Sequence, residues 1–485
     1  MNIELCYLSA VEAIERFKAR TLSPVELLEA LIQRAEQVEP KINAFSFEYF
    51  DEALVAARQA EQRYRRGDAR PLEGIPVAIK DESYIKGQKT TNGSLLLQDY
   101  IAETTSITVE RLLEAGAIVH ARTTTPEFSI SAITVSRLWG ASRNPWNLDI
   151  TCGGSSGGSA AALAAGTTTL ANGSDIAGSI RIPASLCGVV GYKAPYGRNP
   201  EDSPFNLDAY NHPGPLARSV ADCILMQNVM AGPHPLDMAS LKPKLVLPTR
   251  FDGIRDWRIA YSIDLGYQPV EPEVRDQTLV ALDVFRSLGA TVEEVDLGWT
   301  EQGLTATLAH LGYGLMGAYL KPYYESSREQ LTGYARVFTE YALQVSSQDY
   351  YQAEVIANEM YASLSAVFAR YDVFICPTIA NTGVKADFDY SVDDVAINGV
   401  SVNPKFGWLM TYPFNMLSRC PVLSVPAGYA SNGVPCGIQI AGPTYEDSLV
   451  FQAATAYEAA IASEAAIASE AARTPFCSAT NFPAL

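Results

Sequence analysis

The sequence has 485 residues, enough to bury a large core, and its 48% hydrophobic and 19% charged residues are typical of ordinary globular proteins. Acidic residues outnumber basic ones by 54 to 36, and the net charge of −18 argues against binding to nucleic acid or to an anionic membrane. The sequence shows no export signal and no run of about 18 apolar residues, so we expect a cytoplasmic protein.

The N-terminal part predicts helices followed by strands. The first 65 residues indicate two helices, because apolar residues recur at helical spacing and Ser9 and Ser23 are suitable N-caps. The run GIPVAIKD at 74–81 has the apolar character of a short buried strand. Residues 106–121 then predict a helix and a further strand.

The central part is rich in Gly, Ser and Ala. Residues 152–185 predict a loop, a helix of small residues, a strand and a second glycine-containing loop. Residues 257–297 predict a strand, a helix and a strand, which implies a mixed or parallel sheet with helices on both faces. The predicted fold class is therefore α/β.

The last part returns from helices to strands. Residues 303–370 predict helices rich in Tyr. Strand character follows at 372–378, 421–428 and 437–442. The run AAIASE at 459–464 recurs at 465–470, which is too short for a repeat fold and predicts a longer last helix.

Two common kinds of nucleophile receive little support. GSSGG at 154–158 matches the G-x-S-x-G elbow of α/β-hydrolases, with Ser156 as nucleophile. That fold needs a strand before the elbow and a histidine after it, but residues 139–151 look turn-like and the last 175 residues contain no histidine. Cys152 lacks a basic partner in any motif.

Metal-ligand patterns are missing from the sequence. Its four histidines and eight cysteines show neither HExxH nor CxxC spacing. We therefore expect no metal and no cofactor, and eight reduced thiols.

Three separated pieces of the chain suggest another machinery. Lys80 ends the strand GIPVAIKD, Ser155 lies in GGSSGG and Ser179 lies in GSDIAGSIR. With these pieces, and with TTNGS, TTTPEF, RNPWN, GVVGYK, DVFICPT and SVPAG, the chain resembles the amidase signature family over nearly its whole length.

The resemblance implies a fold. It implies one compact α/β/α domain, residues 1–485, in which helices cover both faces of a large mixed sheet. N-terminal helices at 1–70 are expected to pack on a catalytic segment at 74–195 and a substrate-pocket part at about 300–445.

The resemblance also implies roles for the three residues. In the family the second serine is the nucleophile, the first is held through a cis peptide bond and the lysine is the base, which assigns Ser179, Ser155 and Lys80. A free lysine has a pKa near 10.4, and burial lowers such a pKa by up to about 3 to 5 units. A neutral Lys80 could draw a proton from Ser179 through Ser155 and return one to the departing nitrogen.

The loop that carries Ser179 is expected to stabilise the oxyanion, since its small residues leave backbone N–H groups accessible. The expected donors are the N–H groups of Ile176, Ala177, Gly178 and Ser179. The family more usually has glycine where this chain has Ala177, so the backbone must accept a methyl group there. Supporting roles are expected for Ser156, Asp175 and Arg181.

The expected substrate is an uncharged small-molecule amide. The stretch PKFGWLMTYPFNML at 404–417 is similar to the pocket-forming part of the family and favours a hydrophobic or aryl group. Similarity is greatest to the branch of aryl acylamidases, the cyclic nylon-dimer hydrolase and urethane-cleaving amidases. A carbamate is the alternative substrate, because the same acyl transfer applies to it.

A function of another class is that of the tRNA-dependent amidotransferase, whose homologous subunit works with partner subunits on aminoacyl-tRNA. The acidic charge argues against it, as does Ile182, where that protein is expected to have a polar residue. A non-catalytic relative is expected to lack one of the three residues, and none is missing. We expect no nucleic acid or membrane partner, and a monomer or homodimer.

Overall fold

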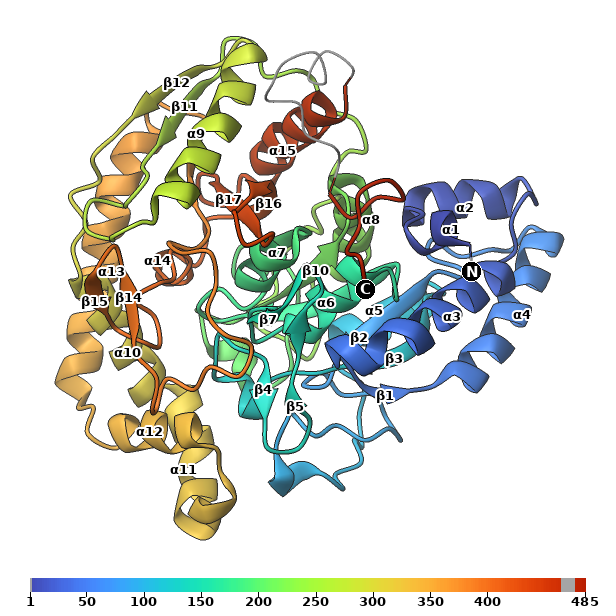
Figure 1. Ribbon diagram of the computed structural model, residues 1–485, viewed down its shortest axis with the longest axis horizontal. Coiled ribbons are helices and arrows are strands. Elements are labelled where there is room, and N and C mark those ends of the chain that lie inside the picture. The colour runs from blue at the N-terminus through green and yellow to red at the C-terminus, as the bar shows by residue number, and fades with distance from the viewer. Residues whose placement is uncertain (1, 464–475) are drawn as a thin grey trace.

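One mixed β-sheet runs through the molecule (Figure 1). The structure, a computed structural model, describes residues 2–463 and 476–485, and within these residues the sheet has eleven strands. In spatial order they are β1 (Phe45–Glu48), β3 (Ile118–Thr123), β2 (Pro76–Lys80), β8 (Leu170–Asp175), β10 (His212–Ala217), β9 (Val190–Lys193), β16 (Val422–Tyr429), β17 (Pro435–Ala441), β13 (Val373–Pro377), β11 (Arg258–Tyr261) and β12 (Thr291–Glu294).

The strands of this sheet run in both directions. β2 is parallel to β3 and β8, and β11 is parallel to β12 and β13. The remaining neighbours, such as β8 with β10 and β16 with β17, are antiparallel. The predicted α/β class and the large mixed sheet are thereby confirmed.

Helices cover both faces of the sheet (Figure 1). Successive side chains of each strand point to opposite faces, so each face carries buried apolar residues. Val77 and Leu170 join the core cluster of one face, whereas their neighbours Ala78 and Ala171 join the opposite one. The first face is covered by α2 (Ala10–Lys18), α5 (Ile107–Glu114), α8 (Val220–Met230), α9 (Pro272–Ser287) and α15 (Asp447–Ala462). The other face is covered by α6 (Gly157–Ala165), α7 (Arg181–Cys187), α10 (Gln302–Tyr313), α11 (Leu315–Ser327), α12 (Gly333–Ala342), α13 (Ser347–Phe368) and α14 (Pro413–Met416).

The N-terminal segment corrects the two-helix prediction. Ser9 does cap α2 by accepting the N–H of Glu12, and Ser23 forms a capping box at the start of α3 (Pro24–Ile42). The chain also forms α1 (Ile3–Cys6), α4 (Phe50–Arg66) and the edge strand β1. β1 has only four residues, which is too short a pattern to predict a strand. Its pairing partner β3 also lies far along the chain, so no local signal marks the pairing.

The segment before Ser155 also differs from expectation. Residues 139–151 are not only turns, because β6 (Arg143–Asn144) pairs with β7 (Asn147–Thr151) in a hairpin. This hairpin stands apart from the main sheet, as do the pairs β4 (Val135–Ser136) with β5 (Gly140–Ala141) and β14 (Val395–Ile397) with β15 (Val400–Val402). No central strand therefore leads into the Ser155 loop.

Three smaller features complete the fold. The last helix, α15, ends at Ala462, and the second AAIASE copy at 465–470 lies outside the described residues. All eight cysteines are buried, and none forms a disulfide within the described part of the chain. Across the same residues no helix is both long and apolar enough to cross a bilayer.

Candidate active site

Lys80 is held at the end of β2, where the surrounding structure buries it completely. Its Nζ atom donates hydrogen bonds to the hydroxyls of Ser155 (2.7 Å) and Ser174 (2.9 Å). The Oε2 atom of Glu82 lies 2.8 Å from the same nitrogen, and the Glu82 side chain is 25% exposed. Burial lowers the pKa of Lys80 below its ordinary value, although the Glu82 carboxylate acts in the opposite direction. An amine with a lowered pKa is therefore aimed at Ser155.

Ser155 occupies a tight loop between β7 and α6. The peptide bond between Gly154 and Ser155 is cis, as the family resemblance implies. A Cβ atom at Gly154 would lie 2.8 Å from the backbone of Ala132, so the loop has no room for a side chain there. The N–H of Ser156 donates to the carbonyl of Ser179 (3.1 Å), which ties the two serine-bearing loops together.

The two rival nucleophiles are buried away from solvent. The Ser156 hydroxyl donates to the carbonyl of Ser174 (3.4 Å), and the residue is completely buried. Burial raises the pKa of Cys152 to about 12, so its thiol stays protonated. Neither residue lines the cavities beside Ser155 and Ser179.

Ser179 lies in the loop between β8 and α7. The residue is 7% exposed and lines a cavity. Within the part of the chain that the structure describes, no hydrogen bond joins its hydroxyl to Ser155, so the two are linked through the backbone contact from Ser156.

The backbone N–H groups around Ser179 fall into two sets. Gly178 donates to Asp175 Oδ1 (2.8 Å), so this N–H is occupied, in contrast to the expected set of four free donors. No acceptor among residues 2–463 and 476–485 takes the N–H groups of Ile176, Ala177 or Ser179. Gly178 has a φ of +127°, whereas Ala177 does not have a positive φ, so a methyl group at Ala177 causes no backbone strain.

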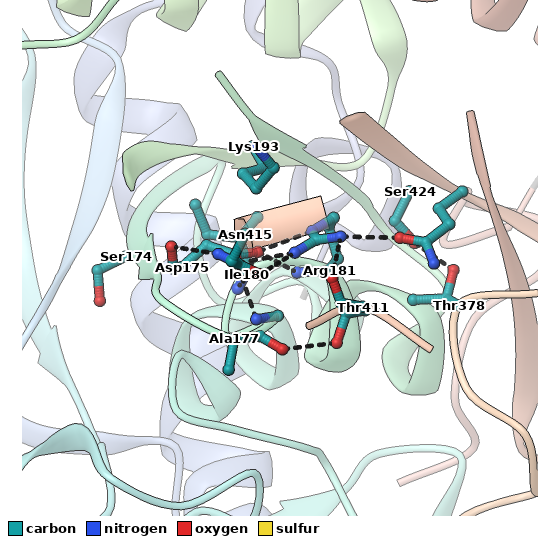
Figure 2. A network of polar contacts seen from close by, with 12 residues as sticks. Ser174, Asp175, Ala177, Ile180, Arg181, Lys193, Thr378, Thr411, Asn415 and Ser424 are labelled. Carbon is teal, nitrogen blue, oxygen red and sulfur yellow. Dashed lines mark hydrogen bonds and ion pairs between the residues drawn. The ribbon is translucent and has the colours of Figure 1, made fainter. Parts of the chain in front are cut away.

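Asp175 and Arg181 brace this loop through a buried ion pair (Figure 2). Arg181 donates from Nε to Asp175 Oδ2 (2.9 Å) and from Nη2 to Asp175 Oδ1 (3.0 Å). Burial alone would raise the pKa of Asp175, but the Arg181 guanidinium and hydrogen bonds from Arg181 and Asn415 hold it well below its usual range. The pair therefore remains ionised and fixes the start of α7.

Residues at and just before α14 complete this support. Asn415 accepts a hydrogen bond from Arg181 (2.7 Å) and donates to the Asp175 carboxylate (2.8 Å). Thr411 donates to the carbonyl of Ala177 (2.7 Å), as Figure 2 shows. The PKFGWLMTYPFNML stretch thus holds the Ser179 loop in place as well as contributing to a cavity wall.

Two adjoining cavities open beside the two serines. The Ser179 cavity has a volume of about 30 Å³ and the Ser155 cavity about 150 Å³, and Ser129, Ile176 and Met316 line both. The Ser179 cavity is also lined by Lys405 and by apolar side chains, among them Ile130, Ala132, Ile182, Leu311, Phe338 and Phe406. The Ser155 cavity carries the carboxylates of Glu82, Glu201 and Asp202.

Several residues of this site escaped the sequence interpretation. Glu82 follows Lys80 by two residues, and Ser174 lies within the GSDIAGSIR motif, so both have a local signal in the sequence. Thr411, Asn415 and Lys405 lie in the stretch 404–417, which the sequence already links to the pocket, but nothing in the printed sequence marks these three side chains.

The chain matches known amidases over most of its length. Residues 26–451 match the amidase family model. An acylamidase from Rhodococcus erythropolis is 36% identical over 461 residues, covering 93% of this chain and 94% of that protein. A glutamyl-tRNA(Gln) amidotransferase subunit from Geobacter sp. (strain M21) is 31% identical, covering 93% of this chain and 97% of that protein. The crystal structure of a bacterial aryl acylamidase of the amidase signature family has a TM-score of 0.86 and 31% identity, covering 94% of this chain and 96% of its own.

Proposed function

Since the chain belongs to the amidase signature family and is an amide-hydrolysing enzyme, we propose that it cleaves the C–N bond of a small, partly apolar amide through an acyl-enzyme on Ser179. The observation that carries the proposal is the 2.7 Å hydrogen bond from the Lys80 amine to Ser155, in a loop tied to Ser179. Lys80, Ser155 and Ser179 are then the catalytic residues, as the sequence predicts.

In the proposed acylation the Ser179 oxygen attacks the amide carbon. Its proton passes to Ser155, whose own proton passes to the neutral Lys80 amine. When the tetrahedral intermediate collapses, the relay runs backwards and protonates the leaving nitrogen, so that a neutral amine departs. Water then attacks the ester by the same relay and releases the acid.

The proposed oxyanion site consists of the free N–H groups in the Ser179 loop. Ile176, Ala177 and Ser179 supply these donors, while Gly178 is engaged with Asp175. A single donor of this kind contributes about 3 to 4 kcal/mol to transition-state stabilisation. Asp175 and Arg181 act as positioning residues, since they fix the loop and do not line either cavity.

The two cavities suggest how the substrate lies. Ser155 hands the proton to the leaving nitrogen, so the leaving amine belongs on the side of the Ser155 cavity. The acyl group then belongs in the Ser179 cavity, whose wall includes the apolar Ile182. An apolar residue at this position, with the net charge of −18, favours a small-molecule amidase acting without partner subunits over an aminoacyl-tRNA amidotransferase.

A release assay on the purified chain tests the proposal. The substrates are p-nitroacetanilide, a short aliphatic amide and a p-nitrophenyl carbamate, and the last one also tests the alternative urethane activity. Ser179→Ala should abolish turnover. Ser185→Ala is the matched control, because the Ser185 hydroxyl is buried in α7 and has no hydrogen-bond partner in the described residues. An active Ser179→Ala protein, or a wild type inactive on every substrate, would refute the proposal.

A further inference from the structure

Lys405 is a buried lysine in the wall of the Ser179 cavity. It is 9% exposed, and its Nζ atom lies 3.8 Å from the ring centre of Phe338, 5.1 Å from that of Tyr390 and 5.3 Å from that of Phe406. Aromatic faces attract a cation but do not replace a hydrogen-bond acceptor. The Lys405 amine is therefore surrounded by three aromatic rings, in a residue that also lines the cavity.

The side chain of Lys405 lacks the partners that the other buried lysines have. Lys80 bonds to two hydroxyls and a carboxylate, and Lys193 donates to the carbonyls of Ser418 (3.4 Å) and Cys420 (3.0 Å). For Lys405 Nζ, no acceptor or carboxylate partner is found within residues 2–463 and 476–485. A buried charge without a partner is costly, so this amine is suited to a partner that arrives with the ligand.

We propose that Lys405 binds a carboxylate at the far end of the substrate's acyl group, so that the enzyme prefers half-amides of short dicarboxylic acids. The proposal rests on the proposed function, in which the acyl group occupies the Ser179 cavity. It replaces the expectation of a wholly uncharged substrate. Burial lowers the pKa of Lys405 well below its ordinary value, and a bound carboxylate would favour the charged ammonium form again.

The charges of the two cavities favour this orientation. Three acidic side chains, Glu82, Glu201 and Asp202, line the Ser155 cavity, and the ionised ones among them disfavour an anionic group on the amine side. Burial and the neighbouring Asp202 raise the pKa of Glu201 to about 8, which reflects an environment that already resists further negative charge. An anionic substrate group is therefore directed to Lys405.

The size of the cavity limits the acyl chain. A volume of about 30 Å³ holds about two or three water-sized groups, since a single water needs roughly 10 to 15 Å³ by this measure. Apolar walls next to Ser179 suit a few methylene groups, with the carboxylate beyond them at Lys405. Succinyl and glutaryl groups are the first candidates.

A pair of nearly isosteric substrates tests this inference. Succinic acid mono-p-nitroanilide and pentanoic acid p-nitroanilide differ in having a carboxylate or an ethyl group at the chain end. In the wild type, kcat/KM should be between about 10- and 100-fold higher for the succinyl substrate, because one charge-assisted hydrogen bond stabilises binding by about that factor. Lys405→Met should reduce this ratio by at least about 10-fold, whereas Lys89→Met, which changes a lysine that lines neither cavity and whose side chain is 43% exposed, should leave it as in the wild type.

The outcomes separate this inference from the proposed function. If the wild type cleaves both substrates with equal kcat/KM, or if Lys405→Met keeps the wild-type ratio, the carboxylate site is refuted while the acyl-enzyme on Ser179 stands. If neither substrate nor any other amide is cleaved, the proposed function fails. Should Lys405→Met not fold, calorimetric binding of the succinyl substrate and its pentanoyl analogue to Ser179→Ala decides, and equal affinities would refute the site.

Discussion

Replacing Arg181 by Met should reduce the free energy of unfolding by about 3 to 5 kcal/mol at pH 7, because it leaves the Asp175 carboxylate buried without its counter-charge. Both side chains are completely buried and share two hydrogen bonds, at 2.9 and 3.0 Å. Asp175 also accepts the N–H groups of Gly178 and Ile180, so the change should disturb the Ser179 loop and lower kcat as well.

Companion variants separate the ion pair from packing. Asp175→Asn leaves the Arg181 cation buried with neutral acceptors, among them Asn415, and should also be strongly destabilised. The double variant Asp175→Asn/Arg181→Met holds neither charge, so its loss should be smaller than the sum of the two single losses by at least about 1 kcal/mol. Urea unfolding measures all three. Additive losses, within about 0.5 kcal/mol, would refute the reasoning.

The pH dependence of these variants is an independent check. Arg181 holds the pKa of Asp175 below the unfolded value of about 3.9, so the wild-type contribution is present above about pH 4 and is lost as the pH falls further. Without the guanidinium, burial raises this pKa, and the folded variant takes up a proton more readily than the unfolded chain. The stability deficit of Arg181→Met should therefore shrink between pH 7 and pH 5, whereas a constant deficit would contradict the account.

Two further predictions concern catalysis. Glu82→Gln removes the carboxylate that raises the pKa of Lys80, so the rising acid limb of the kcat/KM profile should move to lower pH, and an unmoved limb would count against Lys80 as the base. Gly178→Ala places a methyl group against the Thr411 side chain at a φ of +127° and should lower kcat by about 100-fold or more. Gly67→Ala, at a φ of +78° with open space around it, should stay active, and equal losses in both variants would point to general strain.

Much of the fold could be predicted from local patterns. Strands β2, β3, β13, β16 and β17 coincide with short apolar runs in the sequence. Ser9 and Ser23 mark the starts of helices α2 and α3. The order of strands could not be predicted, because β16 and β17 enter the sheet between β9 and β13 through contacts between residues far apart in the sequence. The edge strand β1 escapes prediction for the same reason.

The candidate active site could also be predicted only in part from the sequence. Lys80, Ser155 and Ser179 stand in recognisable motifs, and the structure brings the first two into direct contact. Sequence alone does not reveal that Asp175 occupies the N–H of Gly178, since small residues look equally available when their hydrogen bonds are unknown. Lys405 lies in a largely apolar and aromatic stretch, and only its burial without a partner in the described residues distinguishes it.

The most direct test of the central claim is to identify the residue that carries the acyl group. A p-nitrophenyl carbamate that deacylates slowly should add its acyl mass to the tryptic peptide between Arg143 and Arg181, which contains all three candidate serines. Fragmentation should place the added mass on Ser179, and Ser179→Ala should acquire none. An adduct on Ser155, Ser156 or Cys152 in the wild type would contradict the account.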